Sequence, residues 1–147
     1  MDTASRGVRA LLFERLAGCE PGAAPEARPF RVHDGDALRE SVAREVSRLL
    51  NTRVPAPAPG PAGRTVVDYG LADWTHAAAL DTGARAALEA QVRRSLDAFE
   101  PRLRVRAVRA ETVVGRERTL LINVDAMLVV EGGEEPFSFP VRVGSED

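Results

Sequence analysis

The stretch "SLDAFEPRLRVRAV", residues 95–108, contains the point at which this chain changes from a helical pattern to a strand pattern. Before that point apolar residues recur every three or four positions, and after it they alternate with arginines. Pro101 separates the two patterns, because proline lacks a backbone N–H and keeps the preceding residue out of helical geometry. We therefore expect a helix that ends near Phe99 and a strand that begins near Leu103.

The helix before this junction is expected to begin at Asp81 or Thr82, because the side chains of both residue types can accept hydrogen bonds from a first helical turn. Its buried face is marked by four apolar residues at helical spacing, namely Leu88, Val92, Leu96 and Phe99. It is the last of three helices that the spacing of apolar residues predicts.

Two further helices are expected nearer the N-terminus. A short first helix is indicated by Val8, Leu11, Leu12 and Leu16, with Gly18 as its stop. The second helix can be capped by Asp34 or Asp36. Its apolar stripe consists of Leu38, Val42, Val46, Leu49 and Leu50. Charged residues, including Glu40, Arg44 and Glu45, are expected on its opposite face.

Three strands are expected after the junction, because apolar and polar residues alternate in three successive runs. The first run begins at Leu103 and changes phase near Val108, as a β-bulge would cause. The second and third runs cover residues 122–130 and 137–143, and the turns "VGRER" and "EGGEEP" precede them. Pro140 cannot donate to a strand ladder, which places the third strand at an edge. The predicted fold is α+β, with about three helices on one face of a small antiparallel sheet of three or more strands.

The 147 residues fit one domain, residues 1–147, with a proline-rich spacer inside it. The spacer "VPAPAPGPAG", residues 54–63, contains four prolines, which favour extended backbone over helix. It is predicted to be either a surface spacer within the domain or a mobile loop.

Composition excludes several classes of function. All 20 basic residues are arginine, and with 22 acidic residues the net charge is −2, so the positive surplus of a nucleic-acid-binding protein is missing. No apolar run approaches the roughly 20 residues of a membrane-spanning helix, and the N-terminus lacks a signal-peptide cleavage site. Cys19, His33 and His76 are too few for a metal site. We expect a cytoplasmic protein without a cofactor.

Glu100 and Arg102 flank Pro101 and should project together, because residues two apart in extended backbone point to the same side. On the sequence alone, the pair is expected at an exposed corner between helix and strand. An exposed ion pair contributes about 0–1 kcal/mol to stability. A local surface ion pair at the corner is a sufficient explanation of these two residues, so on physical grounds alone they leave the function open.

Three short motifs occur in order along the chain: "LLNTR" at residues 49–53, "DYGL" at 68–71 and "FEPRL" at 99–103. With this order and the helix-then-strand layout, the chain resembles the baseplate wedge family of contractile injection machines. That family includes the type VI secretion baseplate subunit TssE and the lysozyme-like, sheath-initiating wedge proteins of contractile phage tails. The leading "RALLFERL", residues 9–16, is similar to the type VI branch in particular.

The resemblance implies a structural, non-enzymatic protein that binds other baseplate wedge subunits and contractile sheath subunits. It also implies that Glu100, Pro101 and Arg102 take part in attachment to the assembled particle. The predicted edge strand, with Phe137 and Phe139, offers a second docking mode, because its unpaired backbone groups could exchange a β-strand with a neighbour.

Two other functions remain open. One is the wedge protein of a contractile phage tail, which shares the family motifs. The other, favoured less, is a lysozyme-like hydrolase that cleaves peptidoglycan. Such an enzyme needs two carboxylates across the scissile bond, one of them kept protonated by apolar surroundings. Arg102 beside Glu100 favours the charged carboxylate instead.

Overall fold

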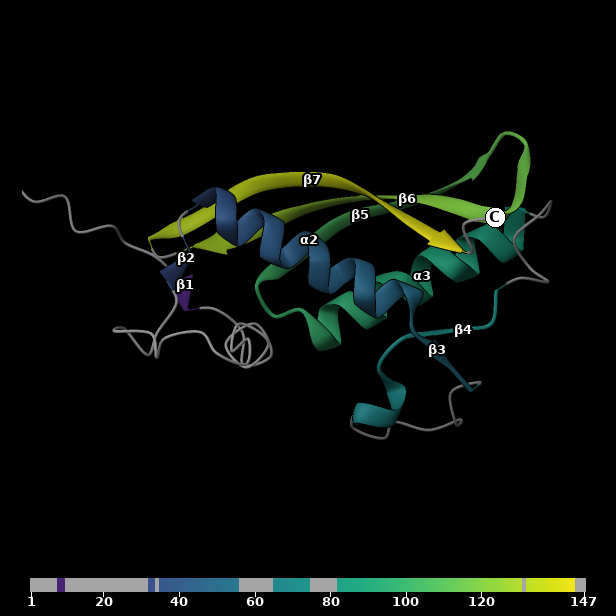
Figure 1. Cartoon of the computed structure of the whole chain (residues 1–147), viewed down its shortest axis with the longest axis horizontal. Coiled ribbons are helices and arrows are strands. Elements are labelled where there is room, and N and C mark those ends of the chain that lie inside the picture. The colour runs from purple at the N-terminus through teal and green to yellow at the C-terminus, as the bar shows by residue number, and fades with distance from the viewer. Residues whose placement is uncertain are drawn as a thin grey trace, which may run out of the picture.

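The structure, a computed structural model, describes residues 8–9, 32–33, 35–55, 65–74, 82–130 and 132–144. Within these ranges two α-helices and a three-stranded sheet form the body of the molecule, as Figure 1 shows. The helices are α2 (Gly35–Asn51) and α3 (Thr82–Phe99), and the strands are β5 (Leu103–Val113), β6 (Arg116–Val130) and β7 (Gly133–Gly144). The α+β class is confirmed.

The sheet is an antiparallel meander in the order β5-β6-β7. Leu103 faces Leu128 across β5 and β6, and Val124 faces Phe139 across β6 and β7. The register shifts between Val105 and Ala107, which confirms the predicted change of phase. β7 has one neighbour, so the prediction that the strand with Pro140 lies at an edge is also confirmed.

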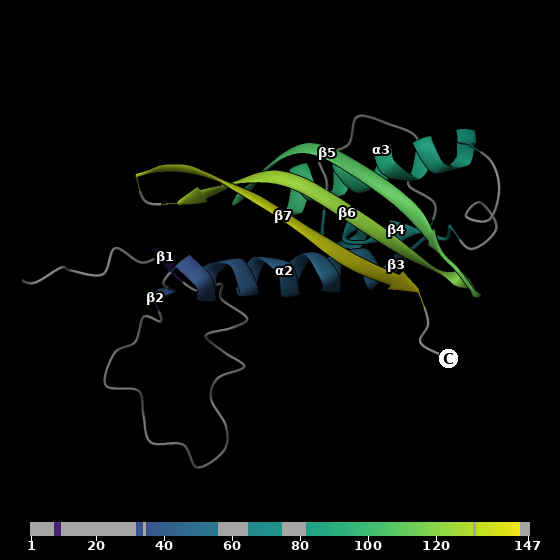
Figure 2. The same ribbon diagram turned by 90° about the horizontal axis from the view of Figure 1, so that it is seen from above.

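Both helices lie on the same face of the sheet, α3 against β5 and α2 against β7 (Figure 2). The reason is the alternation along the strands, since every second residue of β6 from Leu120 to Leu128 is buried. Apolar stripes of the two helices cover that face, including Leu38 and Val46 of α2 and Val92 of α3. The other face of the sheet carries mainly polar and charged side chains.

The prediction of three helices is wrong for the described residues, which contain two. Val8–Arg9 forms a short strand, β1, that pairs antiparallel with β2 (Val32–His33). Apolar spacing over so few residues does not separate a helix from a strand, because pairing with another segment decides between them. The rest of the predicted first helix lies outside the described residues. Neither described helix is long and apolar enough to cross a membrane.

A small parallel pair, β3 (Arg53–Val54) with β4 (Leu71–Ala72), connects the two helices, and the 3-10 turn η1 (Val66–Asp68) lies between its strands. Val54, predicted as the start of the spacer, thus belongs to β3, and residues 56–63 lie outside the described residues. Gly70 adopts φ 136°, and a Cβ there would lie 2.4 Å from the carbonyl oxygen of Thr52. Only glycine permits this close approach, which places Tyr69 beside α2 and α3.

Candidate functional site

Backbone hydrogen bonds connect the helix-to-strand junction to the end of α3, to the start of β5 and to β6. α3 ends at Phe99, and the backbone N–H of Glu100 donates to the carbonyl of Leu96 at 2.9 Å. The carbonyl of Glu100 accepts from Leu103 at 3.1 Å, and the carbonyl of Arg102 accepts from Val129 at 2.8 Å. Glu100 is thus outside the helix, as predicted. We call Glu100, Pro101 and Arg102 the corner.

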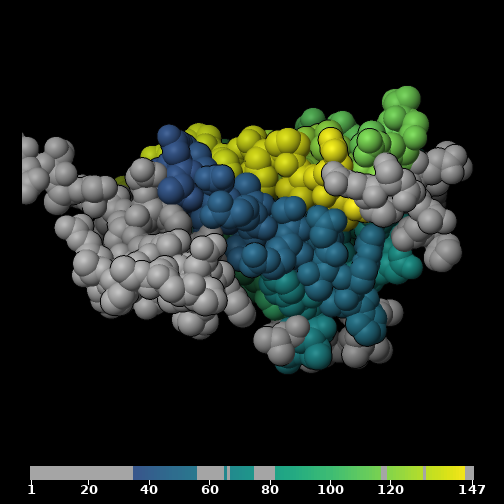
Figure 3. Space-filling view, in the orientation of Figure 1, coloured from purple at the N-terminus to yellow at the C-terminus, as the bar shows by residue number. Residues whose placement is uncertain are grey.

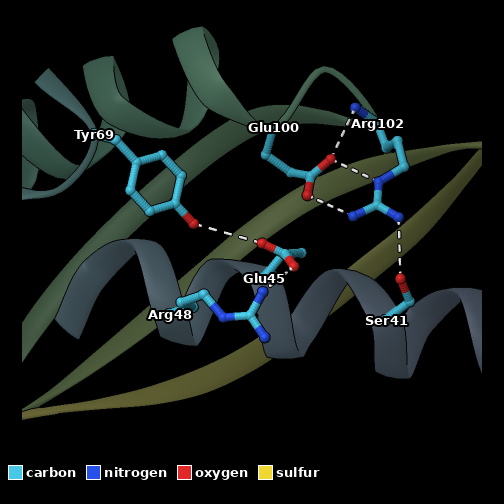
Figure 4. Close-up of polar contacts among 6 residues, drawn as sticks. All are labelled: Ser41, Glu45, Arg48, Tyr69, Glu100 and Arg102. Carbon is cyan, nitrogen blue, oxygen red and sulfur yellow. Dashed lines mark hydrogen bonds and ion pairs between the residues drawn. The ribbon is translucent and has the colours of Figure 1, made fainter. Parts of the chain in front are cut away.

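Glu100 and Arg102 form a two-pronged ion pair, drawn in Figure 4. The Nε and Nη2 groups of Arg102 donate to Oε1 and Oε2 of Glu100, each at 2.7 Å. The backbone N–H of Arg102 also donates to Oε1 at 3.2 Å. This arrangement matches the planar fork of arginine to both carboxylate oxygens, which is the strong form of such a pair.

The expectation of an exposed pair is wrong. The side chains of Glu100 and Arg102 are only 4% and 11% exposed, because α2 covers them. Arg102 Nη1 donates to the hydroxyl of Ser41, a buried residue of α2, at 3.1 Å. Pro101 alone of the corner is exposed. The pair therefore links the end of α3 to α2 inside the fold.

Sequence reasoning missed Ser41 and misplaced Glu45. Ser41 lies three residues after Leu38 and one before Val42, so it falls within the apolar stripe. A hydroxyl in that position needs a buried partner, and this was the available signal. Glu45, expected on the opposite face of α2, is instead largely buried, with 14% of its side chain exposed.

A hollow of about 40 Å³ lies beside the corner. Its lining residues are Glu45, Leu49, Tyr69, Phe99, Glu100 and Pro101. Each of the three sequence motifs contributes, since Leu49 belongs to "LLNTR", Tyr69 to "DYGL" and Phe99 to "FEPRL". The fold thus brings together segments that lie far apart in the sequence.

Tyr69 forms one wall of this hollow. Its ring meets that of Phe99 edge to face, with centroids 5.4 Å apart. Its hydroxyl points at Oε2 of Glu45 at 3.5 Å, the outer limit for a hydrogen bond, and Glu45 also pairs with Arg48 (Figure 4). Burial and, next, the charge of Glu45 raise the pKa of Tyr69 above its ordinary value of 10.0. The hydroxyl therefore keeps its proton and donates.

This environment can be measured directly, because Tyr69 is the chain's single tyrosine. Ultraviolet absorbance should show tyrosinate appearing with a midpoint above pH 10 in the folded protein. The pKa in the folded state exceeds that in the unfolded state, so stability should fall as pH rises past about 10. Glu45→Gln should move the midpoint down. A midpoint at 10 that ignores this substitution would contradict the contact.

Phe137 and Phe139 stack on each other on β7, with ring centroids 4.5 Å apart. Phe139 is buried and Phe137 half-buried, so both contribute to the core. β6 lies between their strand and β5, which follows the corner. The predicted interaction residues thus fall into two groups, one at the corner and one on the edge strand.

Comparison with known proteins gives a family match and similarity to a solved structure. A family model described as "Baseplate wedge protein gp25" matches residues 36–132, more than half of the chain and all three motifs. A solved structure of a provisionally named tail lysozyme from Geobacter sulfurreducens is similar with a TM-score of 0.52 and 21% sequence identity, over 80% of this chain and 97% of that chain. At this identity the likeness shows the fold alone. No curated protein matches the chain.

Proposed function

Because the chain belongs to the baseplate wedge protein gp25 family, we propose that it is a structural subunit in the baseplate of a type VI secretion system. It joins the wedge complex in the cytoplasm and presents a surface on which the first ring of sheath subunits assembles around the inner tube. "RALLFERL", residues 9–16, supports the type VI branch over a phage tail. The alternative is the same role in a contractile phage tail.

The observation that carries this proposal is the convergence of the three motifs at the corner. The buried pair of Glu100 and Arg102 fixes the turn, and Pro101 stays exposed at its tip. A rigid, exposed turn can dock without losing much conformational entropy, which favours affinity. We infer that the corner attaches the subunit to its wedge partners, with Pro101 as the contacting residue and the ion pair as its support.

The edge strand β7 is proposed as the second docking site, through strand exchange with a sheath subunit. An edge strand leaves backbone N–H and C=O groups that another chain can pair with. The stacked Phe137 and Phe139 lie on this strand and hold it against the core.

A hydrolase reading fits this geometry poorly. The carboxylates of Glu45 and Glu100 each pair with an arginine, and the hollow between them is about 40 Å³, too small for a sugar ring. A larger hollow of about 310 Å³ near Asn51 and Arg142 has no carboxylate in its lining. Its volume is within the range of about 300–1,000 Å³ that is usual for small-ligand sites. A glycosidase also needs a pair of carboxylates, which this lining does not supply.

We therefore expect the purified protein not to cleave peptidoglycan. Dye release from labelled peptidoglycan should equal that of a heat-inactivated sample, with a lysozyme of known activity as the positive control. Turnover above that background, abolished by Glu45→Gln or Glu100→Gln, would establish a hydrolase instead.

The proposed function is tested by affinity purification of the tagged chain from its native organism. Wedge and sheath subunits should co-purify, and the neighbouring genes should encode sheath, tube and further baseplate proteins. Capsid and terminase genes beside it would assign the chain to a phage tail. Absence of every baseplate and sheath protein from the purified material would refute the proposal.

A further inference from the structure

A groove of about 310 Å³ runs between α2 and the outer edge of β7. Figure 3 shows these two elements side by side along the front of the molecule. Ala43 and Ser47 line the helical wall, and the wall formed by β7 is lined by Pro140, Val141, Arg142 and Gly144. Small helix side chains leave room beside the strand edge.

One side chain crosses this groove at its end. The Nδ2 group of Asn51 donates to the carbonyl of Arg142 at 3.1 Å, and Oδ1 of Asn51 accepts from the N–H of Gly144 at 3.3 Å. Nδ2 also donates to the carbonyl of Ser47, one turn back in α2, at 2.9 Å. The amide of Asn51 thus makes the donor and acceptor contacts that the N–H and C=O of one residue in an added strand would make.

Farther along this edge, two positions lack a backbone donor. In an antiparallel strand every second residue directs its N–H and C=O away from its neighbour strand. Arg142 and Gly144 do so, because Asn51 reaches them from outside the sheet, and Pro140 and Pro136 share their alternation. Proline has no N–H to offer, so these two positions cannot donate to an incoming strand. Ser138, between the two prolines, has the same alternation and keeps its N–H, so the contacts of Asn51 close the end of the edge at Arg142 and Gly144.

We propose that Asn51 is a latch on the edge of β7. In the free protein it holds Arg142 and Gly144 and prevents strand addition at this end of the edge, which opens when the side chain swings out. The occupant of the opened groove is an extended segment of a partner chain, whose backbone replaces the amide of Asn51. This inference rests on the strand exchange proposed above, and it adds the residue that controls it. Asn51 is exposed, so it can leave without disturbing the core.

The test uses Asn51→Ala, with a second copy of the chain as the probe for an open edge. At low protein concentration, hydrogen exchange at the Gly144 amide should be about tenfold faster than in wild type, because its acceptor is gone. At high concentration the variant should self-associate in light scattering, and the Gly144 amide should regain protection. Wild type should stay monomeric at the same concentration.

Asn123→Ala, the same change on the central strand β6, is the matched control and should leave both readouts at wild-type values. Asn51→Asp, which cannot donate to Arg142, should fall between wild type and Asn51→Ala. The latch is refuted if Asn51→Ala stays monomeric or if its Gly144 amide exchanges at the wild-type rate. These measurements need no baseplate partner. The latch can therefore be supported even if no baseplate protein co-purifies with the chain, and it can be refuted even if such proteins do co-purify.

Discussion

Arg102→Ala is expected to lower the free energy of unfolding by about 3–5 kcal/mol, because it leaves the carboxylate of Glu100 buried without its guanidinium partner. Among the residues that the structure describes, the backbone N–H of Arg102, at 3.2 Å, is the one donor that would remain to that carboxylate. The loss should appear in urea unfolding as an earlier midpoint with an unchanged slope. At roughly 2–4 °C per kcal/mol for a chain of this size, the melting temperature should also drop clearly.

Two companion variants separate an unpaired charge from a lost contact. Ser41→Ala removes the hydroxyl that accepts from Arg102 but leaves the ion pair intact, and it should cost about 1 kcal/mol. The double variant Glu100→Leu with Arg102→Met removes both charges and fills similar volume, so it should cost far less than Arg102→Ala alone. An Arg102→Ala protein that unfolds within about 1 kcal/mol of wild type would mean that water reaches the pair in solution.

The contrast between expectation and structure at this corner has a specific cause. Pro101 and the change of period around it were enough to predict the end of α3, the start of β5 and the common direction of Glu100 and Arg102. Spacing of two residues fixes that they share a side, but not what covers that side. The cover comes from α2, whose Ser41 contacts Arg102 from 61 positions away in the sequence. Because charged residues are mostly exposed in folded proteins, the sequence favoured an exposed position for Glu100 and Arg102.

The same limit applies to other contacts between distant segments. The apolar stripes predicted α2 and α3 because helical spacing is a local property. Tyr69 and Glu45 meet across 24 positions, and Asn51 meets Gly144 across 93, and no local pattern encodes either contact. Pro140 did predict an edge strand, since its missing N–H is a property of the residue itself. Pro140, Arg142 and Gly144 are every second residue of β7, so their backbone groups point to the same side of the strand. Asn51 contacts two of them, which shows that this side faces away from β6.

Burial of the ion pair also changes how the docking proposal must be tested. Loss of assembly in Arg102→Ala would report lost folding first, so it cannot locate an interface. Pro101 is the exposed member of the corner, and a charge placed there should disturb a docked partner without disturbing the pair beneath it. Val114, 99% exposed at the turn between β5 and β6, is the matched control position.

Pro101→Glu and Val114→Glu add the same charge at an exposed turn, and both should unfold within about 1 kcal/mol of wild type. Pro101→Glu should weaken co-purification with wedge subunits by at least about tenfold, because a carboxylate forced into a dry interface is left unpaired. Val114→Glu should bind as wild type does. Equal binding by all three proteins, with stability unchanged, would remove the corner from the interface. The buried pair of Glu100 and Arg102 would then be explained by the link between α3 and α2 alone.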